Sequence, residues 1–185
     1  SCPNPIQISE CKNSYGMDRN RYVSYLIGQE NFFRMLRILI DKAIKKFGKH
    51  LYYIGTNEAI LVVKDWIYDN YPELIGQVGV FTTLTSKEDK RAQLDKTIIL
   101  STTKSAGAAV DIPGLVETVV LAEPFKSRVL AEQTFGRTRA DNTTYKELVD
   151  TGFFFTKRFY EQKKPIYTKI ATECKEVSSA HRNAL

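Results

Sequence analysis

Apolar residues recur at helical spacing over the first strongly patterned segment of the chain, residues 29–47. Its apolar positions lie three or four residues apart, and charged residues occupy the positions between them. In an α-helix this spacing gathers the apolar side chains on one face, so the pattern predicts an amphipathic helix over 29–47. Residues 1–28 have little periodicity. We expect them to form a leading segment, with one short strand or helix near "RYVSYLI" (21–27).

Beyond this helix, short apolar runs alternate with amphipathic or polar stretches. Strands are predicted at residues 50–55, 78–83, 97–102, 118–123 and 145–155. Helices are predicted at residues 57–71, 86–94, 127–137 and 157–177, the last interrupted near Pro165. Units in this order are typical of a mostly parallel sheet with helices on both faces, and nearly continuous apolar runs suit strands that are covered on both sides. The fold class predicted is therefore α/β.

Polar segments follow several of the predicted strands. They are "GTN" (55–57), "TLTS" (83–86), "STTKSAGAAVDIPG" (101–114) and the stretch that begins with "EPFKS" (123–127). Ligands on parallel sheets bind beyond the carboxyl ends of the strands. We therefore expect the functional site among these segments.

The segment "STTKSAGAAVDIPGL" (101–115) combines hydroxyl groups, Lys104 and a run of small residues, and Asp111 follows them. Small residues let a backbone approach a phosphate closely, and the exposed N–H groups can cradle it. The same composition would also serve a long connection between strands that simply requires small residues. From the residues alone, both interpretations remain open.

Two arginines, Arg137 and Arg139, follow Gly136 in "EQTFGRTRAD" (132–141). Arginine presents five N–H donors in a rigid fork that suits phosphate oxygens. Two guanidinium groups this close repel each other unless an anion lies between them, which favours a contact with a phosphate. The alternative interpretation is that both arginines belong to a solvated basic face. Residues 126–170 contain ten basic and five acidic side chains, which accounts for most of the net charge of +6.

The composition limits the classes of function. A chain of 185 residues with 43% hydrophobic residues can form one globular domain, and its positive charge permits a polyanionic partner. The cysteines Cys2, Cys11 and Cys174 lack metal-ligand spacing, so we expect reduced thiols and no bound metal. No membrane span or leader peptide is evident, which predicts an intracellular protein.

Several catalytic patterns are missing from the sequence. It has no G-x-x-x-x-G-K-[ST] loop, no Asp-Glu pair after an apolar strand and no G-x-S-x-G turn. His50 and His181 have no partner pattern for metal binding or triad chemistry, so we interpret them as ordinary surface or strand residues. The chain is thus equipped to contact phosphates, but not to bind and activate a nucleotide alone.

The order and separation of "LYYIGTN" (51–57), "STTKSAGAAVDIPGL" and "EQTFGRTRAD" resemble motifs IV, V and VI of superfamily 2 helicases. These motifs belong to the second RecA-like motor lobe, and the resemblance covers roughly residues 29–150. It is nearest to the viral and bacteriophage DNA helicases of the superfamily. It implies a RecA-like three-layer α/β/α domain over 29–155, preceded by a linker at 1–28. A helical extension at 156–185 would pack on the same domain.

The resemblance also implies roles in motif VI. Gln133 would sit at the cleft between the lobes and couple the nucleotide to the motor. Arg137, after Gly136, would be the arginine finger that reaches the γ-phosphate held by the first lobe, with Arg139 as a second contact. Many family members have that second arginine three residues after the first, where this chain has Ala140. Its G-R-x-R-A order is similar to that of the duplex-RNA-sensing branch.

In motif V, the resemblance makes Thr103, with Lys104 beside it, a contact to the nucleic-acid backbone. Asp111 would meet the nucleotide ribose or link to motif VI, and Ala109 stands where the family often has Gly. In motif IV, Gly55 and Thr56 would touch a backbone phosphate. Thr83, after the second strand, is a further candidate of the same kind.

The family places the missing phosphate loop and acidic pair in a first lobe that precedes this one. ATP with Mg²⁺ would be held mainly by that lobe, and this chain should be inactive alone. The expected partners are nucleic acid, with DNA favoured over RNA, and the N-terminal RecA-like lobe of the same polypeptide.

Alternatives to a DNA helicase lobe are an RNA helicase lobe and a non-catalytic module that binds nucleic acid through the basic region 126–170. A small-molecule α/β enzyme would need a nucleophile or acid–base pair that the sequence does not offer. The aromatic residues between Phe153 and Tyr160 either cover an edge of the sheet or form a stacking surface for bases.

Overall fold

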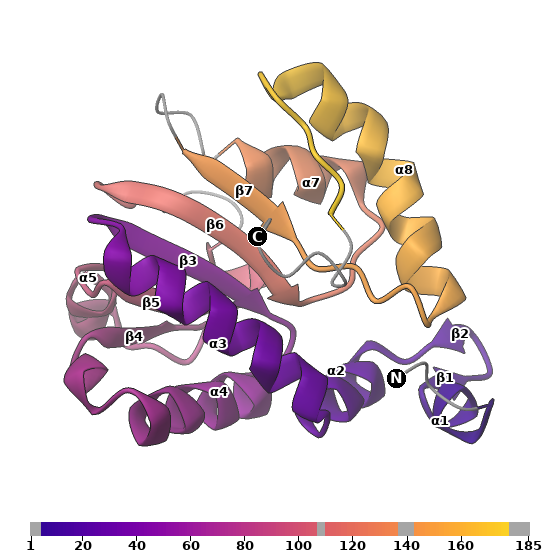
Figure 1. Cartoon of the computed structure of the whole chain (residues 1–185), viewed down its shortest axis with the longest axis horizontal. Coiled ribbons are helices and arrows are strands. Elements are labelled where there is room, and N and C mark those ends of the chain that lie inside the picture. The colour runs from indigo at the N-terminus through magenta and orange to yellow at the C-terminus, as the bar shows by residue number, and fades with distance from the viewer. Residues whose placement is uncertain (1–4, 107–109, 137–142, 178–185) are drawn as a thin grey trace.

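A five-stranded sheet forms the centre of the protein (Figure 1). The computed structural model describes residues 5–106, 110–136 and 143–177. The strands are β3 (Lys49–Ile54), β4 (Val78–Phe81), β5 (Ile98–Ser101), β6 (Leu115–Ala122) and β7 (Thr144–Glu147). Their order is β4-β5-β3-β6-β7, and every neighbouring pair is parallel. The predicted parallel sheet is confirmed.

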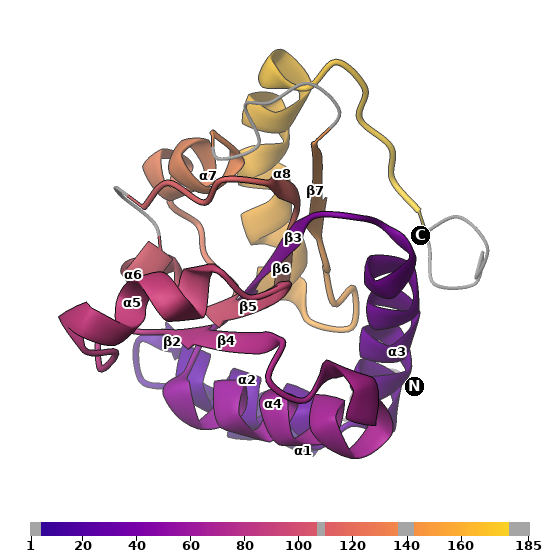
Figure 2. The same cartoon turned by 90° about the vertical axis from the view of Figure 1, so that its left-hand side faces the viewer.

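Helices cover both faces of this sheet (Figure 2). On one face lie α3 (Glu30–Lys45) and α4 (Asn57–Asn70). On the other lie α6 (Thr103–Ala106), α7 (Arg128–Phe135) and α8 (Phe154–Ile170). Successive strand side chains point to opposite faces, so in β3 Tyr52 and Ile54 join the first core, while Leu51 and Tyr53 join the second. The architecture is therefore the predicted three-layer α/β/α.

Local sequence signals account for several helix ends. The Thr56 hydroxyl accepts the N–H of Ala59 at 3.2 Å and caps α4. Ser86 caps α5 (Lys87–Leu94) by accepting the N–H of Asp89 at 3.1 Å. A 3₁₀ turn, η1 (Pro72–Leu74), follows α4.

Within the described ranges, no helix combines the length and the apolar character needed to cross a lipid bilayer.

The N-terminal segment packs against the domain. It contains α1 (Pro5–Glu10), a hairpin of β1 (Lys12–Asn13) and β2 (Gly16–Met17), and α2 (Arg19–Ile27). The short element predicted near 21–27 is thus a helix, and the Asp18 side chain caps it. Val23 enters the first core, and the Tyr22 ring packs edge-on against Phe153 at 5.0 Å. Helix α2 is consequently fixed beside both α4 and the start of α8.

The prediction of one strand over 145–155 was wrong beyond Glu147. Strand β7 ends there, and the Asp150 side chain accepts the N–H of Gly152 at 2.9 Å to form a turn. Phe153 then enters a third cluster with Cys11 and Tyr22, and α8 begins at Phe154. The apolar run suggested a strand, but turn chemistry and packing against the N-terminal segment determine its conformation.

The prediction of a helix over 157–177, interrupted near Pro165, was also wrong in its bounds. Helix α8 begins three residues earlier, continues through Pro165 and ends at Ile170. Proline removes the hydrogen bond to the carbonyl four residues before it, here that of Glu161. Both residues are exposed, so water can satisfy that carbonyl.

Candidate nucleic-acid interface

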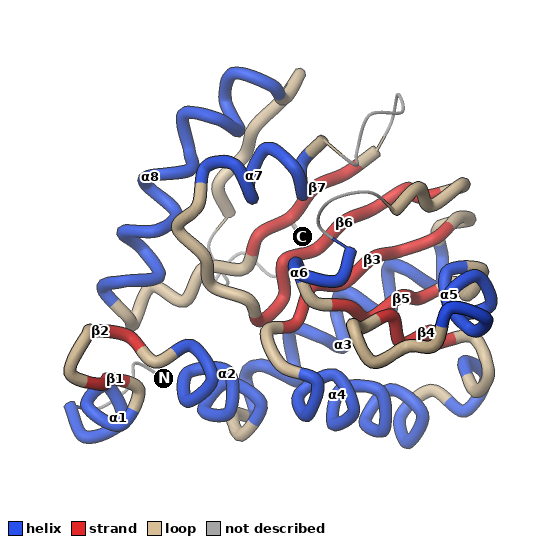
Figure 3. Tube along the Cα trace, turned by 180° about the vertical axis from the view of Figure 1, so that it is seen from behind, coloured by secondary structure: helices blue, strands red, loops and turns tan. Residues whose placement is uncertain are grey.

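The carboxyl ends of β3, β4, β5 and β6 meet at one edge of the sheet, where α6 also lies (Figure 3). An open cleft of about 280 Å³ lies at this edge. Four of the five residues predicted to contact nucleic acid line it: Gly55, Thr56, Thr83 and Lys104. Its other lining residues are Arg19, Asn20, Asn57, Glu58, Thr102 and Glu123. Loops far apart in the sequence thus form one polar site, as the strand-end rule predicts.

Gly55 has a steric reason to be glycine. Its N–H donates to the carbonyl of Ala122 at 3.0 Å, which ties the end of β3 to the end of β6. A Cβ atom at this position would lie 2.9 Å from Cγ2 of Val23 and 3.1 Å from the carbonyl oxygen of Ala122. Thr56 follows directly and caps α4, so the positive end of that helix dipole lies at the cleft.

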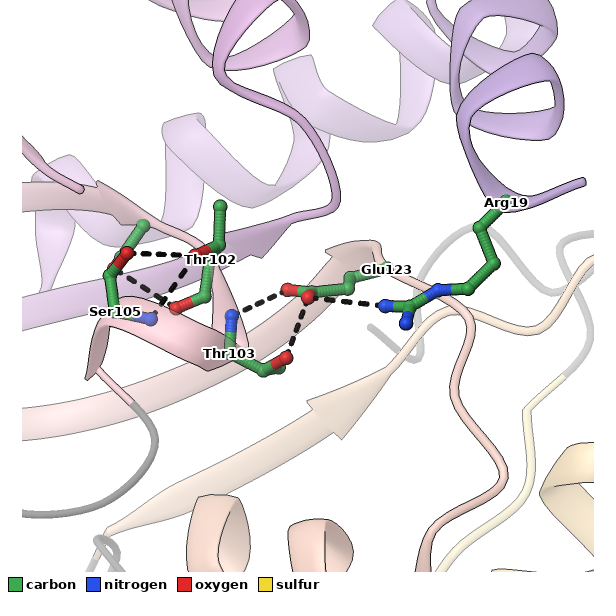
Figure 4. A network of polar contacts seen from close by, with 6 residues as sticks. Arg19, Thr102, Thr103, Ser105 and Glu123 are labelled. Atoms are coloured by element: carbon green, nitrogen blue, oxygen red, sulfur yellow. Dashed lines mark hydrogen bonds and ion pairs between the residues drawn. The ribbon is translucent and has the colours of Figure 1, made fainter. Parts of the chain in front are cut away.

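A buried carboxyl group, that of Glu123, lines the cleft and is the centre of a network of polar contacts (Figure 4). The backbone N–H of Thr103 donates to one of its oxygens at 2.8 Å, and the Thr103 hydroxyl donates to the other at 2.6 Å. Arg19, from the start of α2, contacts that second oxygen at 3.4 Å. Glu123 therefore joins the loop after β5 to the N-terminal segment.

Burial raises the pKa of the Glu123 carboxyl above its ordinary value. The hydrogen bonds from Thr103 and the positive charges of Arg19 and Lys104 act in the opposite direction. These donors explain how a carboxyl group is accommodated at this depth, since an unpaired buried charge would be costly.

Thr103 is buried, and its hydroxyl bonds to Glu123 below the cleft. Its neighbours differ: Thr102 is half-buried, its Oγ1 accepts the N–H of Ser105 at 3.2 Å, and it lines the cleft with Lys104 (Figure 4). Lys104 is exposed. Around this short helical turn, the residues that line the cleft are thus Thr102 and Lys104, and not Thr103.

The residues predicted to face the nucleotide lie elsewhere or outside the described residues. Gln133 is exposed on α7, and Gly136 is the C-cap of that helix. Asp111 is exposed in the connection between α6 and β6. None of these three is among the residues that line the cleft. Arg137, Arg139, Ala140 and Ala109 lie outside the described ranges, so their roles stay predictions.

Six lining residues of the cleft were not named as site residues from the sequence. Asn57, Thr102 and Glu123 lie in the polar segments that follow the predicted strands, whereas Arg19, Asn20 and Glu58 lie outside them. Glu123 had a weak signal, because it ends the apolar run of β6 directly before Pro124. Arg19 and Asn20 had none, since they lie in the N-terminal segment, and Arg19 is 104 residues from its partner Glu123.

A buried ion pair lies between β7 and α8. Lys163 is fully buried and pairs with the carboxylate of Glu147, which also accepts the hydroxyl of Tyr167 at 2.6 Å. The Lys163 ammonium lies over the Phe125 ring, 3.9 Å from its centroid. This arrangement joins α8 to the sheet.

His50 lies in β3, as a strand residue, and it is buried. Its Nδ1 is 3.0 Å from the carboxylate of Glu117, and its Nε2 is 3.2 Å from the carbonyl oxygen of Lys46. Lys146 pairs with the other oxygen of Glu117. Although burial opposes them, the bonds from His50 and Lys146 keep the pKa of Glu117 below its ordinary value. This cluster is distant from the cleft, at the amino ends of β3 and β6.

The architecture defines a RecA-like α/β domain, and several solved structures share it. The chain is similar to the C-terminal part of the Fun30 ATPase domain, with 11% identity and a TM-score of 0.60, over 90% of this chain and 51% of that one. It is also similar to Dbp5 of S. cerevisiae bound to RNA and ADP BeF3, with 13% identity and a TM-score of 0.60, over 94% and 41%. A third similar structure is the SWI2/SNF2 ATPase C-terminal domain of Sulfolobus solfataricus, with 13% identity and a TM-score of 0.50, over 80% and 64%.

These identities show a shared fold and no more. The chain spans between 41% and 64% of the length of these three solved chains. No family model matches the sequence, and no curated protein matches it.

Proposed function

We propose that this chain is the C-terminal RecA-like lobe of an ATP-dependent superfamily 2 helicase or translocase. The observation that carries the proposal is the cleft, where Gly55, Thr56, Thr83 and Lys104 meet from three separate loops. Gly55 and Thr56 belong to the segment that resembles motif IV, and Lys104 belongs to the segment that resembles motif V. The cleft therefore brings these two segments together in one polar site. The similarity of the fold to that of SWI2/SNF2 and Fun30 ATPase domains also supports the proposal.

In the proposed mechanism, ATP with Mg²⁺ would lie between this lobe and a first lobe, which would supply the phosphate loop and hold most of the nucleotide. Arg137, with Arg139 beside it, would contact the γ-phosphate and stabilise charge during phosphoryl transfer. Gln133 and Asp111 would couple nucleotide state to the lobe. Opening and closing of the lobes would then shift the grip of the cleft loops along a nucleic-acid strand.

The proposed partner is a single strand held through its phosphate backbone, with DNA favoured because the motifs resemble those of viral and bacteriophage DNA helicases. Backbone contacts carry little base information. Dbp5, one of the similar structures, is bound to RNA, which supports RNA as the alternative. The 2′-hydroxyl lets a protein distinguish the two, so competition between oligothymidylate and oligouridylate discriminates them.

Lys104→Ala is expected to weaken oligothymidylate binding by the chain several-fold. Its exposed ammonium lines the cleft, so the variant loses one phosphate contact and the slope of log K against log salt should fall by about one. Fluorescence anisotropy over a salt series measures both. The matched control is Lys45→Ala, an exposed lysine at the end of α3. Equal affinities and slopes for the two variants would contradict the assignment of the cleft.

A further inference from the structure

Arg19 extends into the cleft from the N-terminal segment (Figure 4). It begins α2 and lies outside the span that resembles the helicase motifs, so no motif assigns it a role. Its side chain is 45% exposed, and it lines the same cleft as Thr56 and Lys104. A guanidinium in this position can be reached by a ligand, and its fork of donors suits a phosphate group.

Glu123, the present partner of Arg19, also has other hydrogen-bond donors. The Glu123 side chain is only 2% exposed and accepts both donors of Thr103, at 2.8 and 2.6 Å. The contact from Arg19 is longer, at 3.4 Å. If Arg19 moved away, Glu123 would keep two short hydrogen bonds. The structure therefore allows Arg19 to exchange partners without leaving a buried carboxylate unbonded.

The charged residues that line the cleft bear on this exchange. Arg19 and Lys104 are the cations of its lining, and Glu58 and Glu123 are the acids. With Arg19 turned toward Glu123, much of its charge is neutralised before a ligand arrives. A phosphodiester entering the cleft offers acceptor oxygens on the exposed side of the guanidinium, where two parallel hydrogen bonds become possible.

We propose that Arg19 is a phosphate-binding residue of the cleft, which exchanges Glu123 for a backbone phosphate when a nucleic-acid strand binds. This inference rests on the proposed function, since it names a further ligand of the same site. It also gives the N-terminal segment a role. Helix α2 packs beside α4 through Val23. A nucleic-acid strand bound to Arg19 would therefore be attached to the body of the domain through α2.

The test is oligothymidylate binding by the chain over a salt series, measured by fluorescence anisotropy. Arg19→Ala is expected to weaken binding roughly tenfold and to lower the salt slope by about one. Arg19→Lys should retain the slope but not the full affinity, because it keeps the charge and loses the fork. The matched control is Arg21→Ala, an exposed arginine of the same helix that does not line the cleft.

A second measurement follows the Arg19 side chain in the wild-type protein. The NMR signal of its Nε–H group should shift on addition of oligothymidylate, while that of Arg21 stays in place. If the wild-type chain binds but Arg19→Ala matches Arg21→Ala and the Arg19 signal is unmoved, the exchange is refuted and the proposed function survives. If the wild-type chain itself binds no oligonucleotide, the proposed function is refuted as well.

Discussion

Replacement of Arg137 by Ala in the proposed two-lobe protein is expected to abolish ATP turnover while ATP binding persists. The motif resemblance makes this side chain the arginine finger. Such a group stabilises charge that develops during phosphoryl transfer and typically contributes a factor of roughly 10³–10⁵ to the rate. The nucleotide itself would be held mainly by the first lobe, so its affinity should change little. Steady-state turnover and binding of a fluorescent ATP analogue separate the two effects.

Arg128→Ala is the matched control for this variant. Arg128 is exposed at the start of α7, the helix that leads to Gly136. The Arg128→Ala variant also loses an arginine side chain from this stretch of sequence. It should leave turnover near the wild-type rate. Wild-type turnover in Arg137→Ala would instead contradict the assignment of Arg137 as the arginine finger.

Lys163→Ala is expected to destabilise the fold by about 3–5 kcal/mol. The substitution removes the cation that pairs with Glu147 in a fully buried position, and it also empties the space over the Phe125 ring. Glu147 would retain the hydroxyl of Tyr167 but lose its counter-charge. Burial lowers the pKa of Lys163, and the carboxylate of Glu147 opposes that shift.

Urea unfolding followed by circular dichroism measures this effect. The control is Lys164→Ala, because the adjacent Lys164 pairs with Glu176 at the surface and its loss should barely move the midpoint. A double variant, Lys163→Met with Glu147→Gln, should recover much of the lost stability, since it removes both charges together. Equal midpoints for Lys163→Ala and Lys164→Ala would show that the buried pair does not stabilise the domain.

The parts of the fold that follow from local pattern were predicted well. Helix α3 and strands β3 to β6 have strong periodicity or continuous apolar runs, and the strand-end rule located the loops that form the cleft. The errors fell where distant residues decide the conformation. The 145–155 segment has apolar residues suited to a strand, but Phe153 packs against Tyr22, which is far away in the sequence.

Ion pairs between residues that are distant in the sequence could not be predicted either. Nothing in the sequence near Arg19 or Glu123 indicates that α2 and the end of β6 meet, and Lys163 stands among basic residues that look solvated. A lysine is buried only when a partner is present, and that partner is set by the packing of α8 on β7. The sequence therefore predicted the site loops but not the residues that bind them together.

The proposed nucleic-acid site can be tested most directly by an amide NMR titration of the labelled chain with oligothymidylate. The account predicts that shifts gather at the carboxyl ends of the strands, at Arg19, Gly55, Thr56, Thr83 and Lys104. Shifts confined to the amino ends of β3 and β6, around His50 and Glu117, or an unchanged spectrum, would contradict it.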